Sequence, residues 1–565
     1  MRISSFSVMA LGFGLAGTYV SACSNSADDC SALATCGNAA GTSAAGGAGK
    51  LGGGGADGAG AEAGAPSGGV PSGGGSMNLS GATGAGGAGA GGEGGAGPKP
   101  CTGDVADDAA CWTTNEHGVF VSNESGDDSK GDGSREAPFA SIGRGIGAAA
   151  GKNVYVCLGT SGDPYAEQVI LTAAADGVRL YGGFDCTDWS YSINRSAEVA
   201  PTTEVIALRI QSLKKGAYIE NLRFTAADGN GNDASSYGAF VTDSKNVVLK
   251  RVGLTAGKGL DGADSKAAKP GADGTVAGSA QNGDPALCGS PADGNGGKPI
   301  AATCGSKGGN GGGGVVDAQG NPGLSGTPLL NVTPANASNG GPAATADQED
   351  GHDGAKGSSG DAGAVGLQAP SAGMFASAGY SPAGGNAGLT GFPGQGGGGG
   401  GSSKGVGGCR GASGGAGGMG GCGGSGGDGG SGGGASVALL SWASLIAVDH
   451  CTLTTRDAGR GGKGGDGGLR GQGSGGGQGG AGVGKIGLGG LGKPGGAGGD
   501  GGSGSGGTGG PSYALVFSGS KPTYDLADTT LTVGKGGDAG VGGTIDDVKA
   551  PDGSPGNSAA EFEVK

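Results

Sequence analysis

Six charged residues on segments predicted to be β-strands are the first candidates for chemistry in this sequence. A glycoside hydrolase needs two carboxyl groups on opposite sides of the scissile bond, and a polysaccharide lyase needs a basic residue beside a metal ion or another neutralising group. The candidates are Glu220, Arg223, Asp243, Lys250, Arg251 and Asp449. They form no recognisable cluster, and charges on the outer face of a strand are usually solvated. We therefore expect no catalytic residues and a protein that is not an enzyme.

Other patterns that could carry chemistry are weaker. Asp185 and Asp188 lie near Trp189 and could face a carbohydrate, but a structural turn beside a buried aromatic residue explains them better. No Gly-x-Ser-x-Gly motif lies at a predicted strand-to-helix turn. The sequence has no Cys-x-x-Cys motif, and its histidines lie far apart. The histidines are His117, His352 and His450. We expect neither a metal site nor a cofactor.

The N-terminus carries an export signal. Arg2 is followed by an apolar run from Val8 to Val20, which is too short to span a bilayer but suits a secretory signal. The ending Val20-Ser-Ala-Cys23 resembles the lipobox of bacterial lipoproteins, and this resemblance implies that Cys23 is acylated and becomes the mature N-terminus. An ordinary cleaved signal before a cysteine is the alternative. We expect export and a lipid anchor in the outer membrane or at the cell surface.

The remaining cysteines favour disulfides, because an exported protein meets an oxidising compartment. Proximity in the sequence suggests the pairs Cys30/Cys36, Cys101/Cys111, Cys157/Cys186, Cys288/Cys304 and Cys409/Cys422. Cys451 is then left alone.

Composition excludes some partners. Glycine occupies 150 of 565 positions and aromatic residues only 4%, so much of the chain cannot form a conventional hydrophobic core. A net charge of −15 argues against nucleic-acid binding and against electrostatic attachment to anionic lipid. Membrane attachment would therefore depend on the lipid on Cys23.

Strand patterns begin after a Gly/Ala/Ser-rich tether. A short amphipathic helix is predicted after Pro138, because Ile142, Ile146 and Ala149 or Ala150 recur at helical spacing. Strands are predicted at 153–159, 165–171 and 177–185, each bounded by turn residues.

This stretch resembles the opening of right-handed parallel β-helix proteins of the pectin-lyase-like type found on bacterial surfaces. The matching residues are Pro138, Phe139, Ile142, Val154, Val156, Gly159, Thr160, Tyr165, Glu167, Val169, Gly177, Val178, Leu180, Gly182 and Gly183. The resemblance implies an all-β fold with an N-terminal capping helix. It does not imply one function, because that fold carries enzymes, adhesins and other proteins.

Three later segments repeat one another, and they begin at Ser236, Ser436 and Ser512. A fourth, less similar copy begins at Thr203. One coil cannot bury its own apolar face, so these segments should stack as successive coils of one β-helix. The sequence then divides into a signal peptide (1–22), a lipidated N-terminus (23–36), a tether (37–100), an N-terminal β-helix part (101–256), a glycine-rich insertion (257–434), a β-helix coil (435–456), a second insertion (457–510), a further coil (511–533) and a glycine-rich polar tail (534–565).

The glycine-rich insertions should emerge from one corner of the β-helix, because each leaves after the same strand of the repeat. Glycine recurs at every third position in 351–366, 405–432 and 489–510. This period is typical of a threefold extended helix, in which glycine lets a neighbouring backbone approach. Polyglycine-II-like segments and disordered loops both stay open, while scarce proline argues against collagen. Around Asp466, Gly468 replaces the large apolar residue of the calcium-binding nonapeptide, so we reject that motif, although scattered aspartates could bind calcium weakly.

The insertions also resemble the Gly-Gly-x tracts of PGRS-type surface proteins, although this sequence has no N-terminal helical domain of that family. We expect a non-catalytic cell-envelope lipoprotein with a display, adhesion or matrix role. Its partners would be the membrane, through the lipid, and an envelope or extracellular polysaccharide or protein. A polysaccharide-acting lyase or hydrolase is the alternative. A groove lined by convergent charged side chains would favour that alternative.

Overall fold

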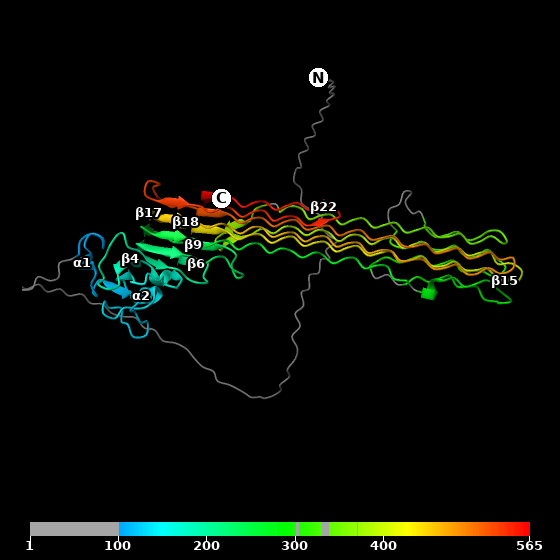
Figure 1. Ribbon diagram of the computed structural model, residues 1–565, viewed down its shortest axis with the longest axis horizontal. Coiled ribbons are helices and arrows are strands. Elements are labelled where there is room, and N and C mark those ends of the chain that lie inside the picture. The colour runs from blue at the N-terminus through cyan, green and yellow to red at the C-terminus, as the bar shows by residue number, and fades with distance from the viewer. Residues whose placement is uncertain (1–100, 277, 301–303, 330–337, 370) are drawn as a thin grey trace, which may run out of the picture. The chain divides into compact units, whose positions relative to one another are not determined.

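The computed structural model describes residues 101–565, apart from 277, 301–303, 330–337 and 370. Three parallel β-sheets stack the chain into coils, and glycine-rich segments run side by side next to them (Figure 1). The expected signal peptide, the tether, Cys23, Cys30 and Cys36 lie outside the described residues. None of the helices in the described part has the length and apolar character needed to cross a bilayer.

The coils from β3 to β18 each contribute one strand to each sheet, in the order sheet C, sheet A, sheet B. Sheet A contains β1 (Gly118–Val121), β2 (Asn153–Leu158), β4 (Arg179–Asp185), β7 (Ala217–Glu220), β10 (Val247–Lys250) and β17 (Ile446–Asp449). Sheet B contains β5 (Ala197–Val199), β8 (Leu222–Thr225), β11 (Gly253–Thr255), β18 (Thr452–Thr454) and β20 (Thr530–Thr532). Sheet C contains β3 (Val169–Leu171), β6 (Ile206–Gln211), β9 (Ser236–Thr242), β16 (Ser436–Trp442), β19 (Ser512–Ser518) and β23 (Ser558–Glu563).

The repeats stack as the sequence predicts. Ser436 lies opposite Ser236 on one side and Ser512 on the other. The fourth copy pairs in the same way, with Leu208 opposite Ala239. The fold is therefore a parallel β-helix, and each coil hides its apolar side chains against the coils above and below.

The core of the β-helix ends on charged residues at one end and a helix at the other. The column of buried leucines that includes Leu439 and Leu515 continues to Glu561 on β23. The Glu561 carboxylate pairs with the Lys521 ammonium at 2.6 Å. At the other end, the expected helix is α2 (Ile142–Ala148), which begins after the N-cap Ser141 and buries Ile142 against the core.

The glycine-rich segments are ordered. We call their array the glycine lattice; it comprises 257–274, 297–300, 304–314, 323–326, 339–344, 351–366, 385–401, 411–434, 458–480, 489–510, 534–543 and 550–556. These segments are neither helices nor β-strands over most of their length. Their bonding repeats every third residue: the amides of Gly421, Gly424 and Gly427 donate to the carbonyls of Gly496, Gly499 and Gly502 at 2.9–3.0 Å. This repeat identifies threefold extended segments of the polyglycine II kind.

Consecutive residues in the lattice bond to different neighbours. Gly421 donates to Gly496, whereas the next residue, Cys422, donates to Ala272 and accepts a hydrogen bond from Gly471. Segment 411–434 is therefore surrounded by other glycine-rich segments, and its buried backbone groups find partners among them.

Glycine marks the sides of a segment that other segments cover. Residues 396–401 are all glycine, and a methyl group at Gly396, Gly397 or Gly398 would overlap the carbonyl oxygen of Lys307, Lys493 or Asn339, respectively. Earlier in the same segment, the positions in phase with Gly398 carry Leu389 and Phe392, which are 63% and 59% exposed. Large exposed side chains therefore lie where the lattice ends, whereas Gln395, which is also in phase with Gly398, is buried inside it.

Aspartates bond to amides at the edges of the lattice. Oδ1 of Asp264 accepts a hydrogen bond from the amide of Lys463 at 2.8 Å, and Oδ1 of Asp466 accepts one from the amide of Thr544 at 2.8 Å. Asp353 binds the amide of Leu491 in the same way. These bonds replace the backbone carbonyl that a further segment would supply, and they give the scattered aspartates a structural role.

Buried serines join the β-helix to the lattice. Oγ of Ser236 accepts a hydrogen bond from the amide of Gly257 at 2.8 Å, and Oγ of Ser436 donates to the carbonyl of Gly257 at 2.7 Å. Ser512 bonds to the Arg456 carbonyl at 3.0 Å. Each serine begins a strand of sheet C and contacts the point where a coil leaves for the lattice, so the insertions do emerge at one corner.

Disulfide pairing differs from the sequence expectation in the lattice. Cys101–Cys111 and Cys157–Cys186 form as predicted, and among the cysteines of the described residues Cys451 is free and buried. The predicted pairs Cys288/Cys304 and Cys409/Cys422 are wrong. The structure pairs Cys288 with Cys409 and Cys304 with Cys422, because lattice segments far apart in the sequence lie side by side.

The remaining elements are short. They are α1 (Ala109–Trp112), the 3-10 helices η1 (Ala173–Ala175) and η2 (Gly278–Gln281), and the antiparallel pairs β12 (Leu287–Cys288) with β15 (Cys409–Arg410), β13 (Met374–Ala376) with β14 (Gly379–Ser381), and β21 (Thr544–Ile545) with β22 (Val548–Lys549). The β13–β14 hairpin covers the outer face of sheet C, where the amide of Tyr380 donates to the hydroxyl of Tyr237 at 2.7 Å.

Candidate functional site

Charged side chains gather at the corner between sheets A and B. The parallel strands β7, β10 and β17 are paired so that their last residues lie above one another; these are Glu220, Lys250 and Asp449. The next residue of each coil turns the corner with a positive φ, and these residues are Asn221, Arg251 and His450. We call these two columns the corner ladder. Because each coil places one residue at the same corner position, residues that are far apart in the sequence come into contact.

The lower part of the corner ladder is a buried ion-pair network. The Glu220 side chain is fully buried, and its carboxylate pairs with the guanidinium of Arg251. The hydroxyls of Tyr191 and Tyr218 lie 2.9 and 2.5 Å from the same carboxylate. Arg251 also donates to Oδ1 of Asn221 at 2.8 Å. Both carboxylate oxygens of Glu220 have partners. The lower part of the ladder therefore stabilises the corner and leaves no carboxylate accessible to a ligand.

Asp104 completes the network from outside the β-helix. It lies in the N-terminal loop that the Cys101–Cys111 disulfide closes, and it accepts hydrogen bonds from Tyr218 at 2.8 Å and Tyr181 at 3.1 Å. Burial opposes the charged form of Asp104, but the bonds from Tyr218, the Val105 amide and Tyr181, together with Lys250, lower its pKa. Burial, followed by the Asp104 carboxylate, raises the pKa of Tyr218. The network therefore fixes the N-terminal loop to sheet A.

A polar groove of about 440 Å³ runs over sheet B beside the corner ladder. Thr225, Thr255 and Thr454 stack in its floor, and Glu198, Arg223, Arg251 and His450 are among the charged or titratable residues that line it. Gly253, which lies between Arg223 and Thr452, has no side chain, so the groove is deeper at this position. The groove crosses successive coils, so its shape suits an extended polar ligand.

The upper end of the corner ladder is open to solvent. Nδ1 of His450 lies 2.6 Å from Oδ1 of Asp449, and its Nε2 lies 3.8 Å from Oδ1 of Asp528. Asp528 belongs to the next coil, two residues before Thr530, which pairs with Thr452. All three side chains are about half exposed, so this end could meet a ligand from outside.

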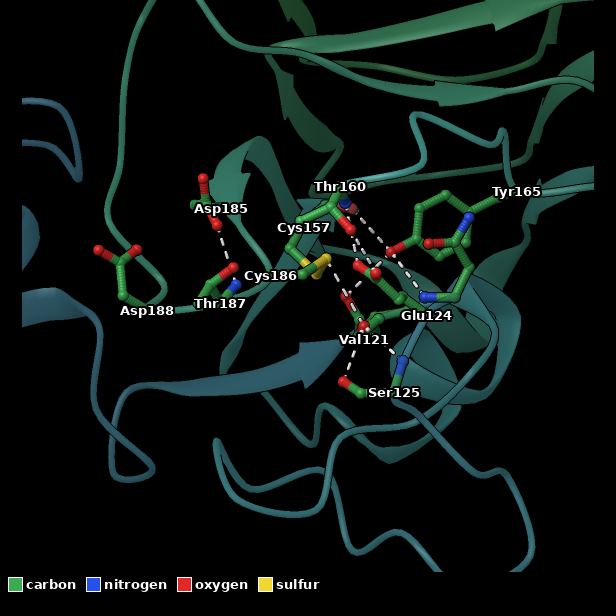
Figure 2. The surroundings of a disulfide bond; sticks show 12 residues. Val121, Glu124, Ser125, Cys157, Thr160, Tyr165, Asp185, Cys186, Thr187 and Asp188 are labelled. Atoms are coloured by element: carbon green, nitrogen blue, oxygen red, sulfur yellow. Dashed lines mark hydrogen bonds between the residues drawn. A yellow bond between two sulfur atoms is a disulfide. The ribbon is translucent and has the colours of Figure 1, made fainter.

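Asp185 and Asp188 hold a turn beside the Cys157–Cys186 disulfide (Figure 2). Oδ1 of Asp185 accepts a hydrogen bond from the Thr187 amide at 2.9 Å, and Asp185 also pairs with Arg195 at 3.2 Å. Trp189 is buried among the aromatic residues that cover sheet A. The structural interpretation of this turn is confirmed.

The structure corrects the expectation that the six charged candidates are scattered. Four of them, Glu220, Lys250, Arg251 and Asp449, meet in the corner ladder, and Arg223 lines the groove beside it. Asp243 does not join them; it lies exposed after β9, where its amide donates to the Trp442 carbonyl at 3.0 Å.

Sequence reasoning missed Asp104, Glu198 and Asp528, and set His450 aside because the histidines are far apart. Aligning the repeats would have placed His450 above Arg251 and Asp449 above Lys250. No comparable signal marks Asp104, because it lies outside the repeats.

Comparisons with known proteins add little. No family model matches this chain, and no match was found among curated proteins. Among solved structures, the chain is similar to the GH136 lacto-N-biosidase from Eubacterium ramulus, with 12% identity and a TM-score of 0.20. The match covers 27% of this chain and 31% of that one, so the chain spans less than a third of that protein's length. A similarity this low carries no argument about activity.

Proposed function

We propose that this protein is a non-catalytic structural component of the cell envelope, in which the β-helix and the glycine lattice form a stiff body for display, adhesion or matrix building. The observation that carries the proposal is the lattice. Its segments bond to different neighbours at successive positions, and the buried serines continue this bonding into the β-helix. Such a body resists bending because its segments cannot move independently of one another.

The cost of ordering these segments supports a mechanical role. Fixing one residue's backbone costs about 1–2 kcal/mol, and glycine loses the most freedom. A loop that only connected two coils would not need this order. The disulfide Cys304–Cys422 links lattice segments that are 118 residues apart, and Cys288–Cys409 links β12 to β15 across 121 residues. Both further restrict the motion of these segments.

Attachment to the membrane would come from acylated Cys23, which lies outside the described residues. The expected arrangement is a lipid anchor, the tether of residues 37–100 and then the stiff body. Surface partners would be polysaccharides or proteins of the envelope or the surroundings. The acidic charge of the chain disfavours nucleic acid as a partner.

Palmitate labelling and cell fractionation test the proposed location. Cells would express the full chain, the variant Cys23→Ser, or the control Cys30→Ser, which removes a nearby cysteine. We expect labelled protein in the membrane fraction for the wild type and the control, and unlabelled, released protein for Cys23→Ser. External protease should degrade the wild type on intact cells. Protein that stays unlabelled in the cytoplasm would contradict the proposal.

A polysaccharide-acting enzyme is the second candidate, and the groove over sheet B is the observation that favours it. Arg223, Arg251 and His450 line the groove together with a floor of threonines. The purified chain would be incubated with acidic and neutral polysaccharides, and new reducing ends and new unsaturated bonds would be measured. Release of either product, lost in both Arg223→Ala and His450→Ala, would establish catalysis. Binding without product would instead identify the groove as an adhesion site.

A further inference from the structure

The open end of the corner ladder brings together three metal-ligating side chains. Asp449, His450 and Asp528 each offer a ligand atom, and these atoms lie within 4.8 Å of one another. Nε2 of His450 and Oδ1 of Asp528 are 3.8 Å apart. Zinc binds nitrogen and oxygen ligands at about 2.0–2.2 Å, so an ion between these two atoms would reach both.

Charge along the corner ladder points to a cation at this place. In the lower part of the ladder, Glu220 pairs with Arg251, and Lys250 lies 3.7 Å from Asp104 of the N-terminal loop. In the upper coils, within the described residues, the ion pairs of Asp449 and Asp528 involve His450 alone. A cation bound beside His450 would supply the positive charge that lysine and arginine supply in the lower part of the ladder.

The groove supplies an independent reason to expect a ligand here. His450 lines the groove of about 440 Å³, and Arg223 and Arg251 line it as well. An ion on His450 would therefore have room for water or for an oxygen atom of a groove ligand. Open coordination positions of this kind are typical of sites that do more than hold the fold together.

We propose that His450 and Asp528 bind a divalent transition-metal ion, such as Zn²⁺ or Co²⁺, at the mouth of the groove, with Asp449 as the residue that orients His450. Asp449 accepts the Nδ1–H of His450 at 2.6 Å, which leaves the lone pair on Nε2 free for the metal. In many metal sites a carboxylate accepts a hydrogen bond from the histidine nitrogen that does not bind the metal, and this bond fixes the orientation of the ring. The imidazole ligand favours zinc, cobalt or nickel over calcium and magnesium.

Cobalt titration tests the site directly, because Co²⁺ bound by histidine and carboxylate absorbs visible light. The full chain would be purified in detergent without a polyhistidine tag, stripped with a chelator and titrated, with calorimetry in parallel. We expect one ion per chain. His450→Ala and Asp528→Asn should each weaken binding at least about 100-fold, and Asp449→Asn should weaken it about 10- to 100-fold.

His352→Ala is the matched control, since His352 is also about half exposed and lies 3.4 Å from the carboxylate of Glu349. Its affinity for Co²⁺ should equal that of the wild type. Circular dichroism would verify that each variant keeps the fold. A wild-type Kd above about 1 mM, or equal binding by His450→Ala, would overturn the proposal. In that case His450 would only bridge two aspartates as an ion pair.

Discussion

Oγ of Ser436 donates a hydrogen bond to the carbonyl of Gly257 at 2.7 Å, although 179 residues separate them in the sequence. Ser436 begins a strand of sheet C, and Gly257 begins the first glycine-rich insertion. The bond joins the point where one coil leaves the β-helix to the point where the chain returns. The β-helix and the glycine lattice are therefore one hydrogen-bonded structure at this corner.

Replacing Ser436 with alanine should destabilise the protein. The buried hydroxyl also accepts a hydrogen bond from the Arg456 amide at 3.1 Å, so its loss leaves two backbone groups without a partner. We expect the free energy of unfolding to fall by about 1–3 kcal/mol. Denaturant unfolding measures this, with the exposed Ser359→Ala as control. Equal stabilities of the two variants would show that the junction contributes nothing.

Replacing Gly398 with alanine should damage the lattice, because the methyl group would overlap the carbonyl oxygen of Asn339. The expected loss is at least about 3 kcal/mol, since backbone on both sides must move. Leu389→Ala, in phase with Gly398 on the same segment, should change stability by no more than about 0.5 kcal/mol, because Leu389 is exposed. Thermal unfolding compares the two. A tolerated Gly398→Ala would contradict the account of why glycine lies there.

The period of glycine predicts the conformation of the insertions, but it does not predict that they pack into an ordered array. Glycine at every third position indicates a threefold extended helix, whereas a disordered loop needs no such period. The number of glycines per triplet carries further information. Residues 351–366 follow Gly-x-x at an edge, 411–434 follow Gly-Gly-x, and 396–401 are all glycine where other segments cover every side. The number of glycines per triplet thus rises with the number of sides that other segments cover, and this relation cannot be seen until the neighbouring segments are known.

The disulfide Cys304–Cys422 should contribute strongly to stability, because it closes a loop of 118 residues. Replacing both cysteines with serine should cost about 4–5 kcal/mol in the loop-entropy account. Peptide mapping under non-reducing conditions checks the pairing first, and should recover Cys304 linked to Cys422 and Cys288 linked to Cys409. Peptides joining Cys288 to Cys304 would show that the lattice segments are arranged differently.

Sequence proximity gave the right pair wherever both cysteines belong to neighbouring coils, as for Cys157 and Cys186. It failed in the lattice, because antiparallel segments place distant residues side by side. The corner ladder is a similar case. Its residues come from separate coils, so spacing along the chain says nothing about their contacts, whereas their shared position in the repeat does.

Acid should weaken the edges of the lattice. The hydrogen bond from the Thr544 amide lowers the pKa of Asp466, and the bond from Arg460 lowers that of Asp264. A carboxyl group whose pKa is lower in the folded state stabilises the protein above its unfolded pKa of about 3.9, and this contribution is lost as the pH falls through the folded pKa. We therefore expect stability to decline below about pH 4.

The variant Asp466→Asn separates charge from hydrogen bonding, because an amide oxygen can still accept the Thr544 bond. It should be less stable than the wild type at neutral pH, and the difference should shrink as the pH falls below about 4. Denaturant unfolding at several pH values measures this. A difference that grows as the pH falls would mean that the Asp466 carboxylate destabilises the lattice.

Hydrogen–deuterium exchange of segment 411–434, followed by mass spectrometry, tests the central claim most directly. If the insertions form a hydrogen-bonded lattice, these amides should exchange as slowly as those of β16 and β19, with protection shared by the neighbouring segment 489–510. Complete exchange of segment 411–434 within seconds at neutral pH, while the β-strands stay protected, would show that the insertions are loose loops and that the lattice does not exist in solution.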